Sequence, residues 1–344
     1  MNPHELYMQR CLDLAAQGFG AVAPNPMVGC VLVHEDRIIG EGYHQKFGEA
    51  HAEVNAINSV ENEALLKDAT LYVNLEPCSH FGKTLPCADL ILQKKIPRVV
   101  IGSYDPNPQV AGRGIKKLRE AGLEVFTEVL KKEADFLNRR FMTYHTKHRP
   151  YIILKWAQSV DGFMALNEPK QFWFTNELSK KLMHKWRTEE QAILVGRHTV
   201  EVDDCELTAR LWPGKNPLRV VIDRRLSLPR TKKIFNEEAK TLVFNEIETT
   251  QRGSTQFTKI DFTGNVPAQI LSHLYSLEIQ SLTIEGGPIT LQHFLEQNLW
   301  DEARIFCTTH QLKTGKLAPA IQVRLIEELK LETNTLKTLL NTTA

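Results

Sequence analysis

Hydrophobic residues recur along the first 146 positions with periods that switch between those of helices and those of strands. Residues 3–18 have an apolar face at helical spacing, with proline near the start and glycine at the end, so we expect a helix there. A polar pair at 35–36 between two apolar runs predicts a hairpin of strands over 28–33 and 37–42. Further helices are expected at 50–60, 87–95, 114–121 and 131–145, and further strands at 71–75, 99–103 and 123–127.

A second succession of elements begins after the polar stretch 147–150, which ends one helix and precedes a new apolar strand. We therefore expect one domain at 1–146 and another at 150–344. Strands alternate with helices in both, which is typical of layered α/β domains. In the second domain strands are expected at 151–156, 192–195, 218–222, 241–244 and 281–284, and helices at 176–187, from about 267 to 277 and from 288 onward.

The composition is that of a globular enzyme, with 42% hydrophobic and 24% charged residues among 344. The formal net charge is +1 and Lys and Arg form no dense run, whereas nucleic-acid binders usually carry a basic patch, so a nucleic-acid partner is not expected. The N-terminus lacks a signal-peptide pattern, and no apolar run reaches the ~18 residues of a membrane span. We therefore expect a cytoplasmic chain with no membrane partner and with reduced cysteines.

One histidine, one carboxylate and two cysteines form the candidate chemical site: His51, Glu53, Cys78 and Cys87. An imidazole and two thiolates are a known ligand set for a catalytic zinc ion, which keeps a fourth position open for water. The order H-x-E…P-C…C is the signature of zinc-activated deaminases, in which the glutamate moves protons and is not a ligand. His51 and Glu53 are expected in the first turn of the helix at 50–60, and Cys78 at the carboxyl end of a strand. Cys87 is expected to start a helix, a position that favours the thiolate.

Eight residues separate the two cysteines, whereas the common deaminase signature has two. The loop carries His80 and Lys83, which could hold an anionic substrate tail or simply be exposed, and the spacing does not decide between these interpretations. The alternative for the cysteines themselves is that they are unrelated and the loop is a surface excursion. Three other cysteines are interpreted as small buried hydrophobic residues: Cys11, Cys30 and Cys307.

Gly286 and Gly287 precede the helix expected from Pro288, where a phosphate group can approach backbone N–H groups. A tight strand-to-helix turn needs glycine for steric reasons as well, so the pair alone is weak evidence. The chain contains no Gly-x-Gly-x-x-Gly motif after a strand in this half, and a Rossmann dinucleotide site is therefore not expected.

Several motifs together resemble the bifunctional pyrimidine deaminase/reductase family of riboflavin biosynthesis, and the resemblance covers nearly the whole chain. They are PNPMVG at 24–29, HAE at 51–53, LEPCSHFGKT at 75–84 with Cys87, DPNP at 105–108, VAGRGI at 110–115, SVDG at 159–162, WFT at 173–175, AILVG at 192–196, LTAR at 207–210 and EGG at 285–287. The resemblance implies a cytidine-deaminase-like three-layer domain followed by an α/β domain similar to dihydrofolate reductase. It also implies Zn2+ and NADPH as cofactors and small phosphorylated pyrimidines as substrates.

The resemblance further implies roles for individual residues, with Glu53 as the catalytic proton carrier. The implied deaminase substrate contacts are Asn25, His44, His80, Lys83, Asp105 and Asn107. The implied reductase substrate contacts are Gln171, Arg187, Leu207, Arg210 and Glu285. The implied NADPH contacts are Ala157, Trp173, Thr199, Asp203, Gly286 and Gly287. The chain departs from the family pattern at Asn74, Gln171 and Cys205.

Two other functions are consistent with parts of the sequence. One is a zinc deaminase of another nucleobase or of tRNA, with a second half of unrelated purpose. The other is a binding protein with structural zinc, although such zinc normally has four protein ligands. The sequence leaves the oligomeric state open, including a homo-oligomer, and it leaves open whether Arg197 or Arg224 contacts the NADPH 2′-phosphate.

Overall fold

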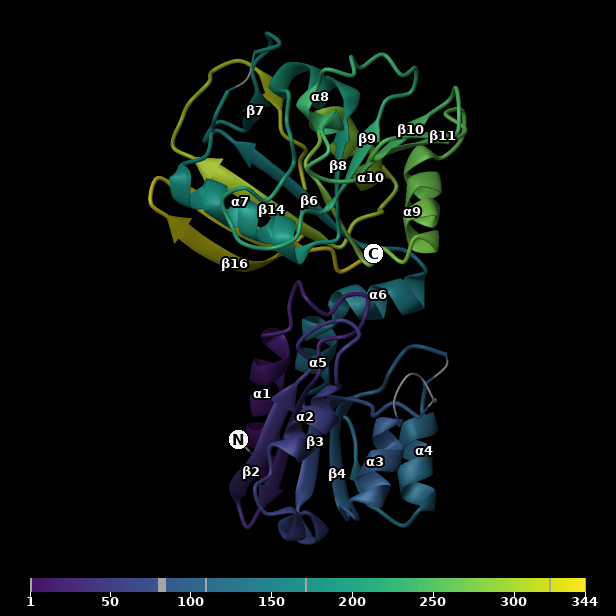
Figure 1. Cartoon of the computed structure of the whole chain (residues 1–344). Helices are drawn as coiled ribbons and strands as arrows, with labels where there is room; N and C mark the ends of the chain where they lie inside the picture. The colour runs from purple at the N-terminus through teal and green to yellow at the C-terminus, as the bar shows by residue number, and fades with distance from the viewer. Residues whose placement is uncertain (1, 80–84, 109, 171, 322, 344) are drawn as a thin grey trace. The chain divides into compact units, whose positions relative to one another are not determined.

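The computed structural model describes residues 2–79, 85–108, 110–170, 172–321 and 323–343 (Figure 1). The chain divides into two compact units, Met1–Lys147 and His148–Ala344, each with its own sheet and hydrophobic core. Within the described ranges, none of the helices combines the length and the apolarity that crossing a membrane requires.

The first unit is a sheet of five strands in the order β2-β1-β3-β4-β5. The strands are β1 (Gly29–His34), β2 (Arg37–Tyr43), β3 (Thr70–Leu75), β4 (Arg98–Ser103) and β5 (Glu124–Phe126). The helices are α1 (Pro3–Ala16), α2 (Ala52–Asn58), α3 (Cys87–Gln93), α4 (Arg113–Glu120), α5 (Lys131–Leu137) and α6 (Arg139–Lys147), with a short 3-10 helix at Glu63–Asp68. Strands β3, β4 and β5 run parallel, so their carboxyl ends meet at one edge of the sheet.

Helices cover both faces of this sheet, which gives three layers (Figure 1). Successive strand residues point to opposite faces, as the two-residue period of a strand requires. Leu71 and Val73 of β3 pack in one cluster with residues of α2, α3 and α4. Tyr72 between them packs on the other face in a cluster with residues of α1. The expected three-layer α/β architecture is therefore confirmed.

Two helix predictions in this unit need correction. The helix expected at 131–145 is two helices that meet at Asn138, because the buried side chain of this residue binds another segment. Its Oδ1 accepts from the backbone N of Met27 at 2.8 Å, and its Nδ2 donates to Met27 O at 2.9 Å. Helix α2 starts at Ala52 rather than at 50, because His51 has an extended backbone and is the N-cap.

The second unit is a sheet of ten strands in the order β11-β12-β10-β9-β8-β13-β6-β14-β17-β16. Its strands are β6 (Tyr151–Gln158), β8 (Ala192–Gly196), β9 (Leu218–Ile222), β10 (Thr241–Asn245), β11 (Thr250–Arg252), β12 (Thr255–Lys259), β13 (Ser281–Ile284), β14 (Glu302–Thr308), β16 (Arg324–Leu331) and β17 (Asn334–Leu340). A separate ladder pairs β7 (Phe163–Ala165) with β15 (Lys316–Leu317). The helices are α7 (Glu177–Glu189), α8 (Arg197–Asp203), α9 (Val266–Ser276) and α10 (Pro288–Glu296), with a 3-10 turn at Lys233–Phe235.

The centre of this sheet is parallel and buried on both faces, which explains why β6, β8 and β13 read as nearly continuous apolar runs. Residues of α9 and α10 pack on one face in the main cluster, and residues of α7 and α8 belong to clusters apart from it. The carboxyl ends of these parallel strands meet at one edge, the usual place for a ligand site in an α/β sheet.

The C-terminal residues complete the sheet, although their sequence predicted no element. Strands β16 and β17 form an antiparallel hairpin that pairs with β14. Cys11 and Cys30 are buried as expected, but Cys307 of β14 is only partly buried, which corrects its interpretation as a core residue. It still packs against the main hydrophobic cluster, and burial raises the pKa of its thiol.

Candidate active sites

His51, Cys78 and Cys87 converge from three segments of the first unit. His51 is the N-cap of α2, Cys78 follows the end of β3, and Cys87 is the first residue of α3. His51 Nδ1 lies 3.6 Å from Cys78 Sγ and 3.3 Å from Cys87 Sγ, and all three donor atoms lie within 4.8 Å of one another. Tetrahedral zinc, with bonds of roughly 2.0 Å to nitrogen and 2.3 Å to sulfur, separates such donors by about 3.5 Å. The donor set and its spacing therefore fit zinc.

The three donors share their protons unevenly in the folded chain, and the hydrogen bond with Cys78 raises the pKa of His51 to about 8. The hydrogen bond from Cys87 lowers the pKa of Cys78 to about 4, and the neighbouring His51 adds to this effect. The same contact, together with burial, raises the pKa of Cys87. The backbone N of Cys87 also donates to Cys78 Sγ at 3.3 Å, as expected at the start of a helix. One thiolate is thus already stabilised in the folded chain.

Glu53 lies in the first turn of α2, two residues after His51, and its side chain is buried. Burial raises its pKa, and the charge of Cys78 acts in the same direction. A carboxyl group whose pKa moves toward neutrality exchanges protons readily at pH 7. Glu53 therefore places a buried carboxyl group with a raised pKa beside the three candidate metal ligands.

Asn25 and His44 form a polar pair next to this cluster. The ring of His44 packs against that of His51 with 5.5 Å between centroids. Burial lowers the pKa of His44, so the ring is neutral at pH 7. Its Nδ1 donates to Ala50 O at 3.0 Å, which leaves Nε2 as the acceptor for Asn25 Nδ2 at 3.1 Å. This arrangement fixes the orientation of the Asn25 amide.

Asp105 and Asn107 follow the carboxyl end of β4, in the turn that the DPNP motif predicted. Asp105 Oδ1 accepts from the backbone N of Asn107 at 2.8 Å. Burial raises the pKa of Asp105 to about 6, and the charges of Glu76 and Cys78 contribute. Asp105 is therefore available both as an acceptor and, near its pKa, as a donor.

Sequence reasoning assigned no role to Glu76, although it stands inside the LEPC motif. Its buried carboxylate accepts from Asp105 N (3.3 Å), Gly112 N (2.9 Å), Gly114 N (2.9 Å) and Ile115 N (3.2 Å). A side chain on Gly114 would meet Pro77 O at 2.1 Å, so glycine is required for this close approach. Glu76 thus ties the 105–115 segment and the start of α4 to the segment that carries Cys78.

Two other predicted contacts and one departure also fall in this unit. His80 and Lys83 lie outside the described residues, so their predicted contacts stay predictions. Asn74, the departure from the family pattern, is fully buried on β3. Its side chain accepts from Gly29 N at 2.8 Å and donates to Met27 O at 3.0 Å. Asn74 and Asn138 together satisfy the backbone of the segment that follows Asn25.

Two adjoining hollows open at the carboxyl edge of the second sheet. The larger has a volume of about 440 Å³, and its lining includes Arg187, Leu207, Arg210 and Glu285. The smaller has a volume of about 230 Å³, and its lining includes Ala157, Trp173, Thr199, Asp203, Gly286 and Gly287. Lys155 and Glu285 line both hollows, so one floor serves the two. The two groups of residues implied by the resemblance thus surround two neighbouring, partly shared spaces, because Trp173, Thr199 and Asp203 also line the larger hollow. Gln171 lies outside the described residues.

Lys155, Arg187 and Glu285 form a nearly buried charge cluster on that floor. Glu285 Oε2 lies 3.6 Å from Lys155 Nζ and 3.1 Å from Arg187 Nη2. Burial alone would raise the pKa of Glu285, but the two cations outweigh it and lower that pKa. Burial lowers the pKa of Lys155. Sequence reasoning gave Lys155 no role, although a lysine inside the otherwise apolar run at 151–156 was the available signal.

The two glycines before α10 differ in why they are glycine. A side chain on Gly286 would meet Thr290 Cβ at 2.6 Å, so packing within the fold excludes it. A side chain on Gly287 would approach only Thr199 Oγ1, at 3.8 Å, which is an ordinary van der Waals contact and no clash. Gly287 therefore keeps the smaller hollow open at the N-terminus of α10, where a phosphate group is favoured.

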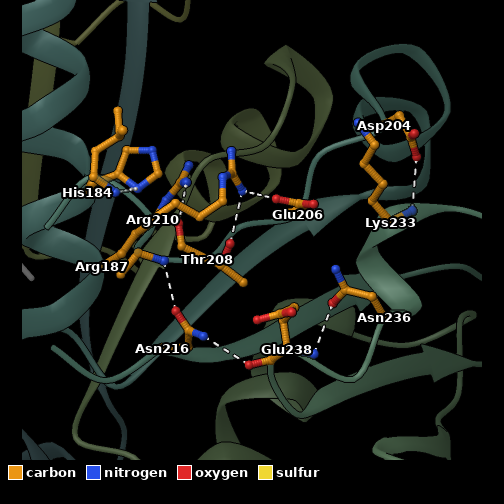
Figure 2. Close-up of polar contacts among 12 residues, drawn as sticks. His184, Arg187, Asp204, Glu206, Thr208, Arg210, Asn216, Lys233, Asn236 and Glu238 are labelled. Atoms are coloured by element: carbon orange, nitrogen blue, oxygen red, sulfur yellow. Dashed lines mark hydrogen bonds and ion pairs between the residues drawn. The ribbon is translucent and has the colours of Figure 1, made fainter. Parts of the chain in front are cut away.

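The loop of residues 207–211 borders the larger hollow and presents Arg210 (Figure 2). Arg210 pairs with Glu206, and its Nη1 donates to Thr208 Oγ1 at 2.9 Å. Leu207 has a positive φ of 56° and a buried side chain in the core, so a substrate contact there falls to its backbone. Cys205, a departure from the family pattern, lines this hollow too, and burial raises its pKa to about 12.

Residues 1–103 match the family model described as the cytidine and deoxycytidylate deaminase zinc-binding region. With the His51, Cys78 and Cys87 geometry, this match defines the class: a zinc-dependent hydrolytic deaminase joined in one chain to a second, reductase domain. Residues 150–338 match the family model described as the RibD C-terminal domain. The chain belongs to the RibD family of riboflavin biosynthesis proteins.

Individual relatives extend the match over nearly the whole chain. The riboflavin biosynthesis protein RibD of Aquifex aeolicus is 42% identical over 327 residues, which cover 94% of this chain and 91% of that protein. RibD of Escherichia coli is 36% identical over 323 residues, covering 88% and 86%. A crystal structure from Thermotoga maritima, named as a diaminohydroxyphosphoribosylaminopyrimidine deaminase/5-amino-6-(5-phosphoribosylamino)uracil reductase, has a TM-score of 0.89 and 36% identity over 98% of both chains.

The chain is therefore a bifunctional deaminase and reductase of riboflavin biosynthesis, and its cofactors are zinc and NADPH. The expected fold class is confirmed in both halves. The alternative of a deaminase with an unrelated second half is wrong, because the second half matches the reductase domain of the same family. A purely structural role for the metal is also wrong, because the zinc-binding region is that of a deaminase.

Proposed function

We propose that the first unit removes the 2-amino group of 2,5-diamino-6-ribosylamino-4(3H)-pyrimidinone 5′-phosphate, and that the second reduces the ribosyl group of the product to ribityl. The observation that carries the proposal is the placement of Glu53 beside the three metal ligands in one unit and of two joined hollows in the other. The Thermotoga maritima relative is named for these two reactions, and its likeness to this chain supports the assignment.

His51, Cys78 and Cys87 hold zinc in the deaminase site. Zinc bound there supplies a Lewis acid that makes water nucleophilic at neutral pH. Glu53 takes the proton released from the attacking water and gives it to the departing amino group, which leaves as ammonia. Its burial and raised pKa support this double use of one carboxyl group. Water adds at C2 and ammonia leaves, so oxygen replaces the 2-amino group.

Asn25, His44, Asp105 and Asn107 bind the pyrimidine beside this centre, and His80 and Lys83 bind its phosphate. Asn25 Nδ2 is engaged with His44, so Asn25 Oδ1 is the atom that accepts a hydrogen bond from a ring N–H. His44 is neutral and therefore does not repel the metal centre. Asp105, with a pKa of about 6, can accept from an amino group or donate to a ring nitrogen.

NADPH occupies the smaller hollow, where Ala157, Trp173, Thr199, Asp203, Gly286 and Gly287 contact it. The space beside Gly287 is open, and no close neighbour in the fold requires glycine there. The N-terminus of α10 at this position favours a phosphate group. The exposed ring of Trp173 forms part of the rim and can cover the bound nucleotide.

The substrate occupies the larger hollow, in contact with Gln171, Arg187, Leu207, Arg210 and Glu285. Lys155 and Glu285 line both hollows. They therefore lie near the place where hydride passes from NADPH to the substrate. We assign them to binding the opened ribosyl chain and to proton transfer during ring opening, because their partly neutralised charges are nearly buried. Arg187 and Arg210 supply guanidinium groups that match phosphate geometry.

The proposed domains are residues 1–146 for deamination and 150–344 for reduction, and the division at 147/148 supports this assignment. The proposed partners are phosphorylated pyrimidines and NADPH rather than nucleic acid. A cytoplasmic site of action follows from the need for NADPH and for reduced Cys78 and Cys87.

The test is a combined assay on the purified chain. Zinc content, ammonia release from the diaminopyrimidinone and NADPH oxidation with the deaminated product are measured on one preparation. We expect about one zinc per chain and both activities. Ammonia release from cytidine, deoxycytidylate or tRNA, with none from the diaminopyrimidinone, contradicts the substrate assignment.

A further inference from the structure

The loop of residues 207–211 is held at three backbone positions by side chains from outside it (Figure 2). Arg187 Nη1 donates to Thr208 O at 3.1 Å. Asn216 Oδ1 accepts from the backbone N of Ala209 at 2.8 Å. His184 Nδ1 accepts from the backbone N of Leu211 at 3.4 Å. The residue between these last two anchors is Arg210.

Each anchor is itself fixed to a rigid part of the unit. His184 and Arg187 lie one turn apart on α7. Asn216 Nδ2 donates to Glu238 O at 2.9 Å, which ties the loop to the segment before β10. The buried side chain of Leu207 fixes the start of the loop in the core. The loop is therefore attached to a helix, to a neighbouring segment and to the core.

We propose that His184 and Asn216 are positioning residues of the reductase, which hold the loop of residues 207–211 so that Arg210 faces the larger hollow in the orientation that binds the substrate phosphate. The inference deepens the proposed function and rests on it, because it takes Arg210 as a phosphate contact. Neither residue belongs to the set that the family resemblance implied. Asn216 is exposed and does not line either described hollow, so it acts through the loop rather than on the substrate. His184 also lines the larger hollow, so N216A is the variant that isolates the positioning role.

The physical benefit is preorganisation. An arginine on a loose loop must be ordered when the ligand binds, and that ordering opposes binding. Here the backbone on both sides of Arg210 is already hydrogen-bonded, while the guanidinium, on a side chain that is 53% exposed, remains able to exchange Glu206 for a phosphate. Exposed ion pairs contribute little stability, so exchanging Glu206 for a phosphate costs little free energy.

The protonation of His184 supports the same role. Burial lowers its pKa to about 4, and the cationic Arg187 and Arg210 act in the same direction. The ring is therefore neutral at pH 7, and its unprotonated Nδ1 can accept the N–H of Leu211. The tautomer that satisfies this bond carries its proton on Nε2. A histidine that stayed charged would repel both the arginines and the N–H.

The experiment measures the reductase half-reaction of the full chain with the deaminated phosphorylated pyrimidine. We expect N216A and H184L each to raise the pyrimidine KM about 3- to 10-fold, as the loss of one hydrogen bond implies. The kcat and the NADPH Kd should stay within about twofold, because neither residue lines the smaller hollow that we assign to NADPH. H184N should restore most of the affinity, because its amide oxygen can accept at the place of Nδ1.

Two controls separate positioning from general destabilisation. Asn265 is also an exposed asparagine of this unit that accepts one backbone N–H, from Ala268 at 2.9 Å, but it starts α9 away from both hollows. N265A should lower the unfolding temperature to a similar degree and leave the pyrimidine KM unchanged. The double variant N216A/R210A should have the KM of R210A alone, because Asn216 acts through Arg210.

Failure of the positioning role and failure of the phosphate contact give different results. If R210A raises KM while N216A and H184L do not, the positioning role is wrong and the phosphate contact stands. If the increases in KM caused by N216A and R210A multiply in the double variant, the positioning role is also contradicted. An unchanged KM in R210A contradicts the phosphate contact and, with it, the inference.

Discussion

In the first unit, three donor atoms from two helix starts and one strand end lie within 4.8 Å of one another, and Glu53 is only two residues from one of them. In the second unit, the charged side chains that line the two hollows come from β6, α7, the 207–211 loop and the residue after β13, among others. One site is compact and defined by ligand chemistry, whereas the other is extended and defined by the shape of a sheet edge.

The difference affects how each site tolerates change. The compact site depends on a few groups that have no substitute, so one substitution should abolish its chemistry. The extended site distributes binding over many contacts, so most substitutions should change affinity in part. Lys155 and Glu285, which form a nearly buried ion pair and line both hollows, should behave like the groups of the compact site.

The largest effect is expected for E53Q. Loss of the proton carrier should lower the deaminase kcat by about 10²- to 10⁴-fold, while zinc content and the reductase activity stay unchanged. E49Q is the matched control, because Glu49 is an exposed partner of Lys46 and should behave as the unmodified chain. Deamination by E53Q at the normal rate would remove Glu53 from the mechanism.

A smaller but still large effect is expected for E285Q in the second unit. The substitution removes the charge that pairs with Lys155 and Arg187, and unpaired buried charges cost about 3–5 kcal/mol. The reductase kcat/KM should fall by at least about 10²-fold, and the deaminase should keep its rate. E296Q on the exposed side of α10 serves as the control. If KM changes and kcat does not, Glu285 is one of the many binding contacts of the extended site and is not required for its chemistry.

An intermediate effect on the compact site is expected for N138L. It leaves the buried backbone N of Met27 without its partner, which costs about 1–3 kcal/mol, while Met27 O keeps the hydrogen bond from Asn74. The nearby Asn25 should lose its fixed orientation, so the deaminase KM should rise while the reductase KM stays the same. Equal losses in both activities would show that Asn138 affects the fold of the whole chain.

A change of affinity alone is expected for G287A. An added methyl group meets no close neighbour in the fold but narrows the space at the start of α10. The NADPH Kd should rise about tenfold with unfolding free energy unchanged within roughly 0.5 kcal/mol. All five tryptophans lie in residues 148–344, so quenching of tryptophan fluorescence measures this binding directly. An unchanged Kd would separate Gly287 from the cofactor site.

The smallest expected effects are changes of folding stability with pH, and these changes have opposite signs in the two units. Burial raises the pKa of Asp105 to about 6 from an ordinary 3.8, so its contribution to stability is present below about pH 4 and is lost as the pH rises to 6. Burial lowers the pKa of His184 to about 4 from an ordinary 6.5, so the second unit loses stability as the pH falls from 6.5 to 4.

These signs are measured by urea unfolding between pH 4 and 7. Tryptophan fluorescence follows the second unit, and release of zinc to a coloured chelator follows the first. D105N should gain stability over the unmodified chain as the pH rises, and H184N should gain it as the pH falls. The same sign in both variants would contradict the assigned protonation states.

The compact site could be predicted largely from the sequence. His51, Glu53, Cys78 and Cys87 are recognisable because zinc chemistry restricts both the residue types and their order. Their elements were placed to within a few residues, apart from His51, which caps its helix rather than lying inside it. The hydrogen bonds that hold the backbone of Met27 were not predictable, since Asn74 and Asn138 lie 47 and 111 residues away from it in the chain.

The residues of the extended site were assigned only through the family resemblance, and their roles stay predictions. No local pattern distinguishes Arg187 or Arg210 from surface arginines, because their function depends on which loops the sheet brings together. Asn216 and His184 gave no signal at all, since they bind backbone groups rather than a ligand. The C-terminal strands β16 and β17 were missed as well, because their stability comes from pairing with β14.

The contrast between the two sites predicts that zinc serves one activity and not the other. The direct measurement removes zinc from the purified chain with a chelator and then follows ammonia release and NADPH oxidation, each with its own substrate. Ammonia release should disappear and return when zinc is restored, while NADPH oxidation with the deaminated pyrimidine continues at its original rate. Loss of both activities together, or deamination by the zinc-free chain, would contradict the account.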